Sequence, residues 1–243
     1  MPEAADRVAA LEAYHRDEVA VCTRCALSAT RTQVVVGDGA PDADLMFVGE
    51  APGYHEDRQG IPFVGQSGKL LTTLLEGIGL RRQDVFIANV LKCRPPGNRD
   101  PAPAEIRDCE PHLFRQIALI RPRMVCTLGN FATKLLSGRP DGISRVHGHE
   151  LPIEVAGHRL LLYPLFHPAA ALYTRAMLST LEEDFARIPG LLRGGTPDRA
   201  ADGPPPAPGP EAAPAPDPAT PPGPPASVAA ATEPTPAEQL GLF

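Results

Sequence analysis

Three side chains that could bind or polarise a small polar ligand follow apolar segments of this sequence. Glu50 comes after the apolar residues 45–48, Asn89 ends a second apolar segment, and His167 ends a third. An amide presents a donor and an acceptor side by side, which matches the edge of a pyrimidine base. Carboxylates and imidazoles can transfer protons or stabilise developing charge. Each residue taken alone is equally compatible with a structural role. Their shared position at the ends of apolar segments is what indicates a site.

The stretch 49–68 carries further reactive or aromatic side chains, among them Glu56, Asp57 and Phe63. Five glycines and two prolines occur in these twenty residues, which predicts an irregular loop without helix or strand. A long loop of this kind at the end of a strand is typical of a functional loop.

Four of the five cysteines are spaced as a set of metal ligands: Cys22, Cys25, Cys93 and Cys109. The close pair would supply two thiolates from one short loop, and the distant pair would tie that loop to the body of the protein. Four thiolates suit either a zinc ion or an iron–sulfur cluster, and the spacing does not distinguish them. The alternative is a set of unrelated free thiols. The fifth, Cys126, lies in an apolar segment and is expected to be a core residue.

The elements that must position these residues alternate between strand and helix. This alternation predicts an α/β fold, a three-layer α/β/α sandwich around a mostly parallel central sheet. Ligands of such sheets bind beyond the carboxyl ends of the strands, where Glu50, Asn89 and His167 are expected to meet. Strands are expected at 33–36, 45–48, 85–91, 124–128 and 160–166, and helices at 3–20, 68–77, 103–120, 131–136 and 175–188.

Composition divides the 243 residues into a domain at 1–193 and a linker at 194–238, followed by the peptide 239–243. The segment from residue 194 onward holds 15 of the 30 prolines, which predicts disorder. It also carries −5 of the net charge of −6, so the domain is close to neutral and its charge excludes no class of partner.

Nothing in the sequence indicates export or membrane insertion. The N-terminal residues lack a basic region followed by an apolar core, and no apolar run approaches ~20 residues. Five cysteines in such a chain favour metal binding or catalysis over disulfides. We therefore expect a cytoplasmic protein.

Several motifs in this order resemble family 4 of the uracil-DNA glycosylases, from about residue 20 to residue 188. They are Gly49-Glu-Ala-Pro-Gly, Gly60-Ile-Pro-Phe-Val-Gly, Asn89-Val-Leu-Lys-Cys-Arg-Pro-Pro-Gly-Asn-Arg and His167-Pro-Ala-Ala-Ala-Leu. The resemblance implies a monofunctional glycosylase that flips uracil out of single- or double-stranded DNA and hydrolyses its N-glycosidic bond. It also implies one four-iron, four-sulfur (4Fe-4S) cluster on the four cysteines, and a monomer associated with the nucleoid.

The same resemblance assigns roles within the site. Phe63 would stack on uracil, Asn89 would bond its O4 and N3–H, and His167 would donate to O2. Glu50 would position or deprotonate the attacking water, with Asp57 as the second candidate. In family 1 an aspartate follows the residue aligned with Glu50, whereas here that position is alanine. The expected uracil-binding residues are Glu50, Ala51, Pro52, Glu56, Phe63, Asn89 and His167, of which Glu50, Asn89 and His167 are expected to be catalytic.

Three further residues are expected to contact DNA. Leu172 would fill the gap left by the flipped base, and Arg175 would meet a phosphate. Ser67, at a predicted helix start, would present backbone N–H groups to another phosphate. Some relatives trap uracil DNA covalently through a histidine after the asparagine strand. No histidine occurs between Asn89 and Cys109, so we expect turnover.

The peptide Gln239-Leu-Gly-Leu-Phe243 resembles the bacterial sliding-clamp-binding peptide. A flexible linker before it would tether the enzyme at sites of replication or repair. The competing hypothesis is a non-catalytic, metal-containing DNA-binding adaptor tethered to the clamp. Glu50, Asn89 and His167 favour the enzyme, because an adaptor does not require a polar pocket of the size of a base.

Overall fold

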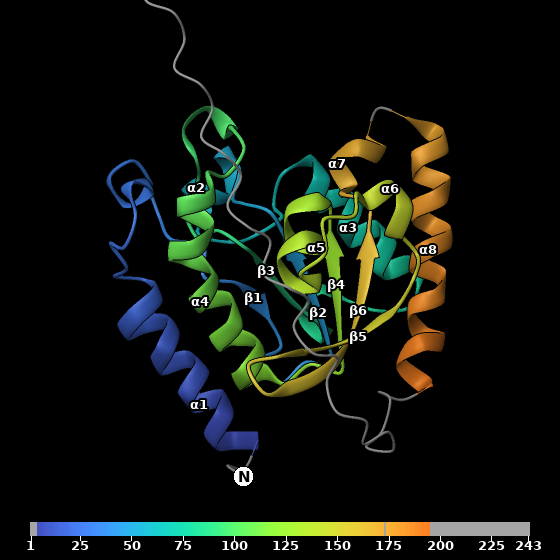
Figure 1. The fold of residues 1–243 in the computed structure, drawn as a ribbon, viewed down its shortest axis with the longest axis horizontal. Coiled ribbons are helices and arrows are strands. Elements are labelled where there is room, and N and C mark those ends of the chain that lie inside the picture. The colour runs from blue at the N-terminus through green and yellow to red at the C-terminus, as the bar shows by residue number, and fades with distance from the viewer. Residues whose placement is uncertain (1–3, 173, 195–243) are drawn as a thin grey trace, which may run out of the picture. The chain divides into compact units, whose positions relative to one another are not determined.

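The computed structural model describes residues 4–172 and 174–194 (Figure 1). These residues form three layers, with a six-stranded sheet between two layers of helices, so the predicted α/β/α architecture is confirmed. The predicted linker, apart from Gly194, and the peptide 239–243 lie outside the described residues.

The sheet has the strand order β1-β3-β2-β4-β6-β5. Its four central strands are parallel, and the two edge strands, β1 and β5, run antiparallel to their neighbours. Gly49 pairs with Asn89, so the carboxyl ends of β2 and β3 are level. The strands are β1 (Asp38–Gly39), β2 (Leu45–Gly49), β3 (Phe86–Asn89), β4 (Met124–Leu128), β5 (Leu151–Val155) and β6 (His158–Leu165).

Helices cover both faces of the sheet, with α1 and α4 on one side and α3 and α8 on the other (Figure 1). Side chains alternate between these layers along each strand. Met46 and Val48 pack toward α1 and α4, whereas Leu45 and Phe47 pack toward α3 and α8. Burial on both faces explains why β2 is a continuous apolar run. The helices are α1 (Ala4–Tyr14), α2 (Tyr54–Gln59), α3 (Gln66–Gly77), α4 (Pro103–Ile120), α5 (Asn130–Ser137), α6 (Ile143–Val146), α7 (Pro168–Ala171) and α8 (Arg175–Arg193).

The prediction that 49–68 contains no regular structure is wrong. A six-residue helix, α2, lies within it at Tyr54–Gln59. The glycines and prolines of the stretch 49–68 all lie outside α2, so none of them interrupts a hydrogen bond of this helix. Gly53 precedes the helix, and Gly60 ends it in the left-handed conformation with φ of 72°.

The outer elements also differ from the prediction. Residues 33–36 are not a strand: the Val35 amide donates to the Lys92 carbonyl, but no ladder continues from this bond. The edge strand β1 lies instead at Asp38–Gly39, and β5 was not predicted. The helix expected at 3–20 is α-helical to Tyr14 and continues as a π-helical turn at His15–Val19. None of the described helices combines the length and the apolar character needed to cross a membrane.

Candidate active site

A cavity of about 350 Å³ opens at the carboxyl ends of β2, β3 and β6. This volume is in the range of small-molecule sites. The cavity brings together most of the residues expected to bind uracil. The exception is Pro52, which is buried and does not contact the cavity. Its lining residues are Glu50, Ala51, Gly53, Glu56, Phe63, Ser67, Asn89, Asn98, His167 and Ala169.

Asn89 ends β3 and is only 2% exposed. Its Oδ1 atom is buried and has no hydrogen-bond partner among the described residues. An unpaired buried acceptor costs ~1–3 kcal/mol, so a native protein seldom keeps one without a purpose. Because Asn89 lines the cavity, the unpaired oxygen indicates a ligand that donates a hydrogen bond there.

Lys92 supports Asn89 from the protein interior. Its ammonium group is buried and donates to the Asn89 backbone carbonyl at 2.8 Å and to Gln116 Oε1 at 2.6 Å. Burial lowers the pKa of Lys92 to about 8. Nothing in the sequence singles out this residue, since a lysine beside a loop rich in arginine and proline is typical of a solvent-exposed side chain.

Phe63 has a buried ring and a left-handed backbone with φ of 53°, which is rare for a residue other than glycine. Arg82 holds this turn, because its guanidinium donates to the carbonyls of Pro62 and Phe63. Gly49 and Gly68 leave room for the turn: a Cβ on Gly49 would lie 2.6 Å from Phe63 Cζ, and one on Gly68 would lie 1.8 Å from the Phe63 carbonyl oxygen.

His167 follows β6, and its ring centroid lies 5.7 Å from that of Phe63, with 30° between the planes. The Ala169 amide donates to His167 Nδ1 at 3.1 Å. Desolvation lowers the pKa of His167 to about 4, so the ring is neutral near pH 7. Since Nδ1 accepts a hydrogen bond, the neutral ring carries its proton on Nε2 and is a donor at that atom.

The two carboxylates considered as bases lie in different surroundings. Glu50 lines the cavity, and burial together with the nearby charge of Asp100 raises the pKa of Glu50. Asp57 is 4% exposed, does not line the cavity, and accepts a hydrogen bond from the Thr32 amide at 2.9 Å. Only Glu50 therefore faces a ligand.

Glu56 forms part of the wall of the cavity and also fixes the loop that follows α2. Its Oε1 atom accepts hydrogen bonds from the amides of Val64 and Gly65, both at 2.9 Å. Gly53 packs closely against the same carboxylate, because a Cβ there would lie 2.8 Å from Glu56 Oε2. The carboxylate is thus held rigidly at the cavity.

Of the three residues expected to contact DNA, one lines the cavity and two are exposed. Ser67 lies in the first turn of α3 and lines the cavity. Leu172 follows α7 and is 40% exposed, and Arg175 begins α8 and is exposed. The short helix α7, with His167 at its start, lies at the end of the sheet toward which the arrows of β4 and β6 point (Figure 1).

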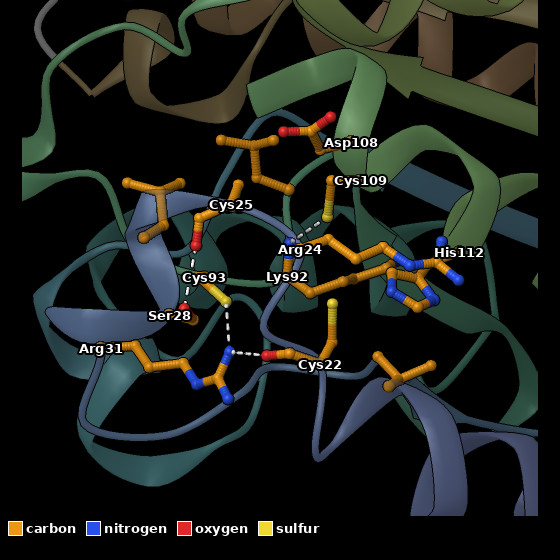
Figure 2. Close-up of a pocket in the computed structure, with 13 residues that line it drawn as sticks. Cys22, Arg24, Cys25, Ser28, Arg31, Lys92, Cys93, Asp108, Cys109 and His112 are labelled. Atoms are coloured by element: carbon orange, nitrogen blue, oxygen red, sulfur yellow. Dashed lines mark hydrogen bonds between the residues drawn. The ribbon is translucent and has the colours of Figure 1, made fainter. Parts of the chain in front are cut away.

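The four spaced cysteines line one narrow cavity of their own (Figure 2). Cys22 and Cys25 come from the loop before a 3₁₀ turn at Ala26–Ala29, Cys93 follows β3, and Cys109 lies on α4. All four are free thiols. The described residues contain no group of histidines, cysteines and acidic residues close enough to hold a single metal ion.

Polar groups surround these sulfur atoms. Arg31 Nη1 and the Lys92 amide donate to Cys93 Sγ and Cys109 Sγ, both at 3.3 Å (Figure 2). Burial raises the pKa of Cys93, and that of Cys109 to about 11. His112 also lines the cavity, and its buried Nε2 has no partner among the described residues. Donors aimed at sulfur and an unpaired polar atom both fit a cluster with inorganic sulfide.

Cys126 is separate from this set. It lies in β4, is fully buried, and packs in the core toward α3 and α8. Its prediction as a core residue is confirmed.

The chain is similar to known proteins over most of the described region. Residues 36–188 match the family model of the uracil DNA glycosylase superfamily. The type-4 uracil-DNA glycosylase of Saccharolobus solfataricus is 47% identical over 177 residues, which cover 71% of this chain and 82% of that protein. The type-4 enzyme of Archaeoglobus fulgidus is 46% identical, over 70% of this chain and 88% of its own length. That of Thermotoga maritima is 45% identical, over 66% and 82%.

Proposed function

The chain belongs to the uracil-DNA glycosylase superfamily, and we propose that it removes uracil from DNA by hydrolysing the N-glycosidic bond. The product is an abasic site, which initiates base excision repair. The observation that carries this function is the buried Asn89 Oδ1, which no other described residue satisfies, in a cavity that also holds Phe63 and His167. A cavity of about 350 Å³ admits one base, so the nucleotide must first leave the helical stack.

Asn89 would read the uracil edge. Its Oδ1 accepts from N3–H and its amide nitrogen donates to O4. Cytosine presents an acceptor at N3 and a donor at C4, the opposite pattern, and would leave both sets of buried groups unpaired. A site built on hydrogen bonds discriminates strongly for this reason. The support from Lys92 keeps the end of β3 at a defined position for this reading.

Phe63 and Glu56 would set the shape of the cavity. The ring of Phe63 lies beside the imidazole of His167, so a base in the cavity can stack on it. Rejection of thymine is a steric effect at C5. We assign it to the wall that includes Glu56, because two backbone amides hold that carboxylate and it cannot yield to a methyl group.

Bond cleavage places negative charge on uracil and positive character on the sugar. The Nε2–H of neutral His167 would donate to O2 as the negative charge grows, and a preorganised donor of this kind stabilises the transition state. Glu50 would orient or deprotonate the attacking water and oppose the charge of the sugar. Its raised pKa and its place in the cavity favour it over Asp57, whose carboxylate is bonded elsewhere.

DNA would be held around this cavity by groups at its edge. Exposed Leu172 would fill the space of the flipped base, and Arg175 would meet a phosphate. Backbone amides at the start of α3, around Ser67, would meet another phosphate.

Cys22, Cys25, Cys93 and Cys109 would hold one 4Fe-4S cluster. The N–H donors directed at Cys93 Sγ and Cys109 Sγ, together with the resemblance of the motifs to family 4, favour the cluster over a zinc ion. When bound, it would serve as a structural cross-link between the N-terminal segment, the loop after β3 and α4.

The peptide Gln239–Phe243 would bind the bacterial sliding clamp through a glutamine and apolar anchors, and the linker would tether the glycosylase to it. We expect the enzyme to act as a monomer at the nucleoid in the cytoplasm. Deletion of the five residues should abolish clamp binding and spare excision on free oligonucleotides. Unchanged clamp binding after this deletion would refute the tether.

The test of the function is excision of uracil from labelled single- and double-stranded oligonucleotides, followed by alkaline cleavage at the abasic site. Matched oligonucleotides with cytosine or thymine at the same position are the controls. Excision restricted to uracil is the expected result. DNA binding without excision would instead support the non-catalytic adaptor.

A further inference from the structure

An exposed aromatic ring adjoins the uracil cavity. Tyr54 is the first residue of α2 and is 50% exposed, and it directly follows Gly53, which lines the cavity. The guanidinium groups of Arg94 and Arg58 lie 5.3 Å and 5.9 Å from the centroid of its ring. We refer to Tyr54, Arg58 and Arg94 as the Tyr54 platform.

The platform is connected to the cavity at two points. Consecutive Cα atoms are about 3.8 Å apart, so Gly53 places Tyr54 within one residue of the cavity wall. Arg94 Nε donates to Asn98 Oδ1 at 2.6 Å, and Asn98 is itself part of the lining. A nucleotide held in the cavity would therefore have its nearest neighbour in the strand close to the platform.

Charge distinguishes the platform from an ordinary surface cluster. Neither Arg58 nor Arg94 forms an ion pair with a carboxylate in the part of the chain that the structure describes. Two unneutralised guanidinium groups against a half-exposed ring leave both an aromatic surface and positive charge available to a ligand. A nucleobase with its phosphates offers the complementary pair, since bases stack on aromatic rings and on arginine, and phosphates bind arginine.

We propose that the Tyr54 platform binds the nucleotide next to the flipped uracil on the same strand. The neighbouring base stacks on Tyr54, and Arg58 and Arg94 bind the adjacent phosphates. This inference rests on the proposed function and names a subsite for it. In single-stranded DNA the neighbouring base is free to stack on the ring, whereas in a duplex it is already paired. The platform therefore stabilises complexes with single-stranded DNA more than those with duplex DNA.

The experiment uses the full chain and fluorescence anisotropy with single-stranded oligonucleotides that carry 2′-fluoro-deoxyuridine, a uracil nucleotide that resists hydrolysis. One oligonucleotide has normal bases beside the target, and the other has abasic residues at both neighbouring positions. Tyr54→Ala should bind the first about tenfold more weakly than the parent, within the range of base–aromatic stacking, and should bind the second as the parent does. Tyr54→Phe keeps the ring and should bind both as the parent does.

An equal loss of affinity of Tyr54→Ala for the two oligonucleotides, or no loss for either, would overturn the proposed stacking on Tyr54. Arg58→Ala and Arg94→Ala should each reduce the slope of log affinity against log salt by about 0.7, the value for one phosphate of a single strand. An unchanged slope in both variants would overturn the phosphate contacts. An assay of uracil excision by the parent distinguishes failure of the Tyr54 platform from failure of the proposed function. A parent that excises uracil while Tyr54→Ala keeps its full affinity refutes the platform alone, and a parent without excision refutes the proposed function.

Discussion

Replacement of Asn89 by alanine tests whether this amide binds the ligand or stabilises the fold. The side chain is buried at the end of β3, and its Oδ1 is unpaired among the described residues. In the free protein, Asn89→Ala removes an unsatisfied acceptor, which relieves ~1–3 kcal/mol, but it also removes the packing of a buried side chain, which costs a similar amount. We therefore expect the free energy of unfolding to change by no more than about 1 kcal/mol.

The effect on catalysis should be much larger. In the complex, Asn89→Ala removes two hydrogen bonds to uracil and leaves N3–H and O4 unpaired in a desolvated cavity. Each unpaired buried group costs ~1–3 kcal/mol, so we expect a loss of about 3–4 kcal/mol of transition-state stabilisation. This corresponds to a decrease in kcat/KM of about 10²- to 10³-fold.

Gln116 offers a matched control, because it is a second buried amide with all its partners in place. It accepts from Lys92 and donates to the Val36 carbonyl. Gln116→Ala leaves the buried lysine without this acceptor, so it should destabilise the fold by about 3 kcal/mol or more. The assays are single-turnover excision and urea unfolding of both variants. Excision by Asn89→Ala within about threefold of the parent, or destabilisation of that variant by more than about 2 kcal/mol, would refute the reasoning.

Three further predictions follow from the site. Gly49→Ala places a Cβ 2.6 Å from Phe63 Cζ, so excision should fall by at least about tenfold while circular dichroism still shows a folded protein; full activity would contradict the contact. The pKa of His167 is lowered to about 4, so the unfolded chain binds more protons below pH 6.5, and the parent should lose about 2 kcal/mol of stability at this residue between pH 7 and pH 5. The free energy of unfolding, measured with urea at both pH values, should not show this loss in His167→Asn. An equal change between the two pH values in the parent and the variant would contradict the assignment. Cys93→Ala should lose iron and visible absorption, whereas Cys126→Ala should retain both; iron retained by Cys93→Ala would contradict the cluster.

Much of the fold follows from local pattern. The apolar run of β2 is buried on both faces, and such runs alternating with amphipathic segments predict a parallel sheet between helices. The helix at Pro103–Ile120 and the strand at Met124–Leu128 agree with the predicted bounds. Local pattern failed at α2, because a count of glycines over the whole loop does not show that they fall outside six consecutive residues.

By itself the sequence determined which chemical groups end the central strands. It also determined that these ends share one edge of the sheet, because parallel strands have no other arrangement. Only the tertiary structure decided the state of those groups: that Asn89 Oδ1 has no partner within residues 4–172 and 174–194, that His167 is neutral with its proton on Nε2, and that Asp57 lies outside the cavity. Hydrogen-bond partners and desolvation come from segments far apart in the chain, and residue spacing does not record which of them pack together.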